Sequence, residues 1–145
     1  MLHIIIVRFP QFTDFLVIDK MPNSINLFSE LYPSEKKYRF CTTIETNRIY
    51  KNIMGETSTP QESAESMIKG EFITIEPIMD FDMAGMVELI KTCEPEQVNI
   101  GADSKYNGLP EPSKGKVLEL IAQLEAFTKV NRKETIYKIL NNQDG

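Results

Sequence analysis

A regular alternation of strand-like and helix-like segments, starting at Tyr38, constrains the fold of this chain more than any other feature. Runs of β-branched and aromatic residues suit buried strands, and they predict strands at 38–44, 72–75, 97–100 and 127–130. Strands that alternate with helices favour a parallel sheet with right-handed crossovers. We therefore expect an α/β fold with a mainly parallel sheet of about four or five strands, a partial TIM-type (β/α) barrel, since a complete barrel has eight.

Polar residues mark the starts of the intervening helices. Thr59, with a proline at the next position and a glutamate three residues on, forms a capping-box pattern. Asp82 and Ser113 are placed to cap the next two helices, and 133–141 is predicted as a closing helix. Three lysines are interpreted as solvated helix charges: Lys91, Lys114 and Lys116.

The first 37 residues do not share this regular pattern. Residues 2–9 are β-branched and short, so they predict a strand. Four apolar residues are predicted to form one face of a short helix: Phe12, Phe15, Leu16 and Ile18. We interpret residues 1–145 as a single domain with an atypical amino-terminal segment at 1–37.

Composition excludes several classes of function. The 145 residues are 41% apolar, enough for one core. The net charge of −5 is spread along the chain and forms no basic stripe, which argues against a nucleic-acid partner. No apolar run approaches the ~20 residues of a membrane span, so we expect a soluble, cytoplasmic protein. The two cysteines, Cys41 and Cys93, are far apart in sequence and lie in apolar surroundings, so both are predicted to be buried thiols. The chain has a single histidine, so no metal site is predicted.

Polar residues follow the predicted strands, where parallel α/β folds place their sites. Glu45 and Asn47 follow the first regular strand, Glu76 the next, and Asp103 the third. Glu45 and Glu76 have either a site role or a structural one, because a carboxylate at a strand tip needs a partner or a raised pKa. Asn99 alternates with two apolar neighbours, so it either contacts a ligand or ties strands together.

Four segments resemble, in order and spacing, the carboxy-terminal half of a phage- and prophage-associated family of radical-SAM-like proteins. They are Cys41–Arg48, Ile73–Asp82, Gln97–Ser104 and Leu109–Ser113, and the likeness covers about residues 38–140. The resemblance implies a half-barrel whose missing first half would carry a C-x3-C-x2-C loop. That loop would hold a [4Fe–4S] cluster that cleaves S-adenosylmethionine.

This chain lacks that loop, and two isolated cysteines cannot supply the three thiolates that the cluster needs. We therefore expect S-adenosylmethionine and [4Fe–4S] only if a partner chain completes the site. The resemblance also implies that five positions would contact the cofactor or substrate: Glu45, Asn47, Glu76, Asn99 and Asp103.

Three functions follow as hypotheses. The first is a degenerate domain, not catalytic in isolation, that forms a homo-oligomer or joins a partner chain through the open edge of its sheet. The alternative is a subunit of a radical S-adenosylmethionine enzyme whose cluster half another chain supplies. A third is a hydrolase or lyase that uses Glu45 and Glu76 as an acid–base pair.

Overall fold

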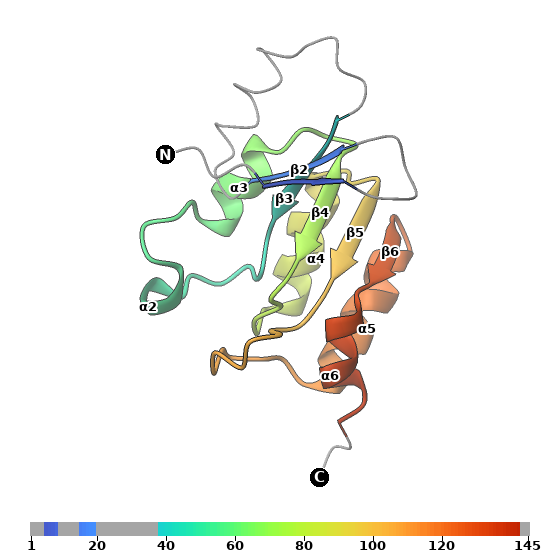
Figure 1. Ribbon diagram of the computed structural model, residues 1–145. Helices are drawn as coiled ribbons and strands as arrows, with labels where there is room; N and C mark the ends of the chain where they lie inside the picture. Colours follow the sequence, from blue (N-terminus) through green and yellow to red (C-terminus); the bar gives the residue numbers. More distant parts are fainter. Residues whose placement is uncertain (1–4, 9–14, 20–37, 143–145) are drawn as a thin grey trace.

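The described strands of the protein form one six-stranded sheet, in which they follow one another in sequence order (Figure 1). The computed structural model describes residues 5–8, 15–19 and 38–142, with side chains for residues 39–142. The strands are β1 (Ile5–Arg8), β2 (Phe15–Asp19), β3 (Tyr38–Thr43), β4 (Phe72–Ile75), β5 (Gln97–Ile100) and β6 (Lys129–Arg132). β1 pairs antiparallel with β2, and all later pairs are parallel. The predicted α/β fold with a mainly parallel sheet is confirmed, with one or two strands more than expected.

The described helices lie between the parallel strands from β3 to β6 and after β6. They are α2 (Lys51–Met54), α3 (Pro60–Ser66), α4 (Met83–Thr92), α5 (Lys114–Glu125), the 3-10 helix η1 (Glu134–Ile136) and α6 (Tyr137–Leu140). The capping box predicted at Thr59 is present, and Ser113 accepts a hydrogen bond from the Lys116 amide at the start of α5. The predicted closing helix is instead a 3-10 turn followed by a short α-helix. None of the helices in the described ranges is long and apolar enough to cross a bilayer.

The hydrophobic core lies on one face of the sheet. Ile73 pairs with Val98 and Ile75 with Ile100, and these four side chains are fully buried. Helices α4 and α5 cover this face (Figure 1). They contribute their buried residues Met86, Leu89, Ile90, Val117, Leu120, Ile121 and Leu124. Because the crossovers place both helices on the same side, the opposite face of the strands is left to other residues.

That opposite face carries a polar row. The strand register places Thr43, Thr74, Asn99 and Asn131 beside one another across four strands. The Asn99 Oδ1 accepts hydrogen bonds from Asn131 Nδ2 at 2.9 Å and from Gln97 Nε2 at 2.7 Å. Asn99 therefore ties β5 to β6, which is one of the two roles expected for it.

The structure corrects one expectation in the amino-terminal segment. Phe15, Leu16 and Ile18 belong to β2 and not to a helix, because β2 pairs with β1 on one side and with β3 on the other. Backbone pairing within the sheet overrides a helical spacing of apolar residues. Phe12 lies outside the described residues. The strand expected at residues 2–9 is present at 5–8, and its remaining residues also lie outside the described part.

Candidate functional site

The carboxyl ends of β3, β4, β5 and β6 lie along one edge of the sheet, because these strands are parallel and paired in order. We call this the carboxyl edge; it consists of residues 44–48, 76–82, 101–104 and 133–135. Backbone hydrogen bonds hold its loops together: Met79 N donates to Glu45 O at 3.0 Å, and Ile78 N donates to Gly101 O at 2.9 Å. The common polar edge predicted from the sequence is therefore present.

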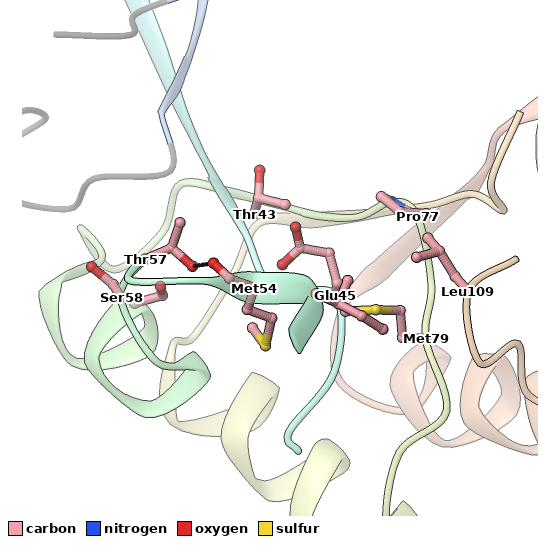
Figure 2. Close-up of a pocket in the computed structure, with 10 residues that line it drawn as sticks. Thr43, Glu45, Met54, Thr57, Ser58, Pro77, Met79 and Leu109 are labelled. Atoms are coloured by element: carbon pink, nitrogen blue, oxygen red, sulfur yellow. Dashed lines mark hydrogen bonds between the residues drawn. The ribbon is translucent and has the colours of Figure 1, made fainter. Parts of the chain in front are cut away.

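A pocket of about 220 Å³ lies at this edge, between α2 and the ends of β3 and β4. Its lining is Thr43, Glu45, Ile53, Met54, Thr57, Ser58, Ser63, Pro77, Met79 and Leu109. Figure 2 shows the Glu45 carboxylate directed into the space between Met54 and Pro77. Of the lining residues, Glu45 alone carries a charge. The pocket thus combines one carboxylate with hydroxyl groups and apolar walls.

Glu76 belongs to a different part of the carboxyl edge. Its carboxylate forms an ion pair with Lys133 and accepts a hydrogen bond from Thr135 Oγ1 at 2.8 Å. The Glu76 side chain crosses the end of β5 at Gly101. A Cβ added to Gly101 would lie only 2.6 Å from Glu76 Oε1. Glu76 is therefore a tie between β4 and the segment after β6. It does not line the pocket that contains Glu45, so the structure does not gather the two into an acid–base pair.

Asn47 lies at the start of α4. Its Oδ1 accepts a hydrogen bond from the Asp82 amide at 2.8 Å, and its Nδ2 lies 2.5 Å from where a Cβ on Gly85 would be. Asp82 occupies the predicted N-cap position of α4, but its side chain makes no capping hydrogen bond. Asp82 instead pairs with Arg48, which draws its carboxylate away from the helix amides.

A charged cluster that the sequence did not predict surrounds Arg48. Its guanidinium binds Asp82 at 2.6 Å and also binds Asp80, and Lys116 Nζ lies 2.6 Å from the second oxygen of Asp80. Burial alone would raise the pKa of the Asp80 carboxyl, but hydrogen bonds and charge from Lys116 and Arg48 outweigh it and lower that pKa. The hydrogen bond from Arg48 is the main cause that lowers the pKa of Asp82.

Lys116 is thus not simply solvated, since its ammonium also lies 4.8 Å from the centre of the Phe81 ring. Arg48 and Asp80 are far apart in sequence, and only the parallel pairing of β3 with β4 brings them together. The signal available in the sequence was a cation after one strand and acids after the next.

Asp103 organises the loop after β5. Its side chain is buried and accepts hydrogen bonds from the Lys105 amide and from Asn107 Nδ2, each at 3.0 Å, and from the Asn107 amide. The backbone hydrogen bonds from Lys105 and Asn107 are the main causes that lower the pKa of the Asp103 carboxyl. Its described contacts are those of a loop anchor.

The thiols of this chain do not fit an iron–sulfur cluster. Burial raises the pKa of Cys41 to about 12 and that of Cys93 to about 11, which disfavours the thiolate that binds iron. Cys41 lies on the polar face of β3, whereas Cys93 packs in the core on the other side. With only two cysteines in the chain, on opposite faces, three thiolates cannot converge. Residues 39–142 also contain no group of three or more His, Cys, Asp or Glu side chains suited to a metal ion.

The fold and the site define an α/β protein with a sequentially ordered, mainly parallel sheet and a small pocket at its carboxyl edge. Comparison of the chain with models of known protein families finds no match, and comparisons with the curated proteins and the solved structures find no significant match. The function is therefore inferred from the chemistry of the edge, the pocket and the sheet.

Proposed function

We propose that the chain is a partial (β/α) barrel of the radical-SAM-like type that has no cluster of its own, is not catalytic alone, and works as an assembly module. The observation that carries this proposal is the open sheet, in which β6 is the last strand of the order. A sequential parallel order with α4 and α5 on one face is the repeat of (β/α) barrels. An outer strand offers backbone hydrogen-bonding groups to another chain. A partner would extend the sheet at β6.

The polar row on the face of the strands opposite α4 and α5 supports a barrel-type assembly. In a closed barrel, the side chains opposite the helices fill the lumen. Here Thr43 and Asn99 are buried, whereas Asn131, at the β6 end of the row, is exposed. A strand added beyond β6 would continue this row and enclose Asn131.

The charges on β6 favour a different chain over a second copy. Lys129 and Arg132 are both exposed. Two β6 strands that pair antiparallel would bring the cations Lys129 and Arg132 of both copies to one seam, and β6 contains no acidic residue to offset them. Like charges brought close together across a pair of strands are destabilising. An edge strand that carries Asp or Glu would instead gain from both positions, so the proposed partner has an acidic edge.

Purification of the tagged chain from its native host, followed by size-exclusion chromatography with light scattering, tests this proposal. We expect a complex with a second chain, whereas the chain alone remains a monomer at high concentration. Hydrogen exchange should show slower exchange of amides at 129–132 in the complex than in the free chain, because the added strand covers them.

Matched charge reversals separate this edge from general electrostatics. Lys129→Glu should remove the partner, while Lys91→Glu, the same change at an exposed site on α4, should retain it. A free monomer in the native host contradicts the proposal. A complex that survives Lys129→Glu, with no change in exchange at 129–132, contradicts it as well.

A partner that carries the cluster would make the chain a subunit of a radical S-adenosylmethionine enzyme. The position of the carboxyl edge favours this second candidate, because a barrel closed at β6 would bring the partner's strand ends to the same rim. Anaerobic reconstitution with iron and sulfide should then give a brown protein with the purified partner and none with this chain alone. A colourless complex would exclude the enzyme subunit and support the non-catalytic assembly module.

A further inference from the structure

We infer that Asn107 is a site of spontaneous deamidation, and that the carboxylate it gains releases the loop that follows β5. Asn107 is followed by Gly108, and both residues are exposed. The site lies in the loop after β5 and involves no residue of β6. It is therefore a property of the chain in addition to the proposed assembly.

The backbone amide of Gly108 is available as a nucleophile. Glycine has no Cβ, so its nitrogen can approach the preceding side chain closely. A Cβ added to Gly108 would meet nothing within 4 Å, so open space surrounds this residue. Within the described part of the chain, the Gly108 N–H donates no hydrogen bond. This amide can therefore turn toward the Asn107 side chain without breaking a contact of its own.

Asn52 shows the opposite arrangement and serves as an internal control. It is also exposed, but it lies in α2 and is followed by Ile53. The Ile53 amide donates a hydrogen bond to Tyr50 O at 2.9 Å, so it is occupied. The β-branched side chain of Ile53 also crowds its own backbone. Exposure alone therefore does not make an asparagine of this chain reactive.

The reaction exchanges ammonia for water. The Gly108 nitrogen attacks Asn107 Cγ, so that a new N–Cγ bond forms and the Cγ–Nδ2 bond breaks. The proton of the Gly108 amide leaves with the Nδ2 group as ammonia, and a cyclic imide remains. Water then opens the imide at either carbonyl and gives aspartate or isoaspartate. No oxidant or reductant is consumed, and the side chain gains a negative charge at neutral pH.

The new carboxylate forms beside that of Asp103. In the unmodified protein, Asn107 Nδ2 donates to Asp103 Oδ1 at 3.0 Å, and the Asn107 amide donates to the other oxygen. Backbone hydrogen bonds from Lys105 and Asn107 lower the pKa of the Asp103 carboxyl, so it is ionised at neutral pH. Deamidation replaces the donating NH2 group by a second carboxylate. An attraction thereby becomes a repulsion between like charges.

Release of this loop affects the carboxyl edge. Leu109 comes directly after the reactive pair and lines the pocket between α2 and the ends of β3 and β4. Pro110 O accepts a hydrogen bond from the Asp80 amide, which joins the loop to the segment after β4. The modification therefore loosens a wall of the pocket as the protein ages.

Peptide mapping by mass spectrometry tests the modification on folded protein kept at pH 8 for several weeks. We expect Asn107 to convert to aspartate and isoaspartate, while Asn52 stays intact. Incubation in water labelled with heavy oxygen should place the label in the new carboxylate, which separates this reaction from conversion during sample handling. An intact Asn107, or conversion at Asn52 that is equally fast, overturns the assignment of the site.

A matched pair of variants tests the consequence. Asn107→Asp reproduces the product, and it should speed hydrogen exchange of the Lys105 amide at least about tenfold, because this amide loses its hydrogen bond to a charged group. Asn52→Asp makes the same charge change on α2 and should leave that rate unchanged. Slow exchange within α5 verifies that each variant is folded. An unchanged Lys105 rate in Asn107→Asp, or an equal increase in Asn52→Asp, overturns the release of the loop.

Discussion

Replacement of Gly101 by alanine tests the packing of Glu76 over the end of β5. A Cβ at this position would lie 2.6 Å from both Glu76 Oε1 and Thr135 Oγ1, where ordinary contact begins at 3.4 Å. Neither atom can move freely, because Lys133 and Thr135 both hold the Glu76 carboxylate. Overpacking of this kind costs about 1–3 kcal/mol. Alanine also restricts the unfolded chain more than glycine does, which offsets about 0.4–1 kcal/mol of that cost.

We therefore expect Gly101→Ala to lower the free energy of unfolding by about 1–2 kcal/mol, or the Tm by about 3–6 °C. Urea unfolding followed by circular dichroism measures this change. A double-mutant cycle with Glu76→Ala identifies the cause, since the cost of Gly101→Ala should fall to about 0.5 kcal/mol or less once the carboxylate is absent.

Gly115→Ala is the matched control for this substitution. Nothing lies within 4 Å of the added Cβ at Gly115, which is in the first turn of α5. Alanine there should stabilise the protein by up to about 1 kcal/mol, because it restricts the unfolded chain. An equal cost of Gly101→Ala with and without Glu76, or a gain in stability, would refute the packing argument.

Three further predictions follow from the described contacts. Thr59→Ala removes the capping box of α3 and should cost about 1 kcal/mol in urea unfolding; an unchanged midpoint would contradict it. Asp80→Asn breaks the pairs with Arg48 and Lys116 and should cost about 1 kcal/mol at pH 7. Because the pKa of Asp80 is lowered on folding, its contribution to stability is lost as the pH falls from about 5 through the folded pKa. Asp80→Asn should therefore lose less stability than the unmodified protein over this pH range. An equal dependence of the free energy of unfolding on pH in both proteins would contradict this. Native Cys41 and Cys93, with pKa values near 12 and 11, should react with iodoacetamide at pH 8 far more slowly than in urea, and equal rates would contradict this.

Local signals predicted the regular part of the fold well. The strands beginning at Tyr38, Phe72 and Gln97 and the helix starts at Thr59 and Ser113 follow from β-branched runs and capping residues, which act over a few positions. Errors arose where neighbours in space decide the outcome. The segment 15–19 is a strand because β1 and β3 pair with it. Helix α2 has no buried residues, so no spacing of apolar residues could have predicted it.

The candidate site was predicted as an edge, but the roles within it were not. Parallel order places Glu45, Glu76 and Asp103 at the same end of the sheet. The sequence could not show that Glu76 reaches over Gly101 to Lys133, or that Glu45 enters a pocket beneath α2. Those contacts join residues that are distant along the chain.

The sequence by itself determined the alternation of strands and helices, the side-chain caps at Thr59 and Ser113 and the absence of enough thiols for a cluster, because composition and short-range spacing suffice for each. Only the tertiary structure decided which charges pair. Arg48 meets Asp80 and Asp82, and Lys116 joins them, because adjacent parallel strands bring their ends together. Hydrogen bonds and ion pairs depend on distances of a few ångströms, and those distances are set by the packing of the whole sheet.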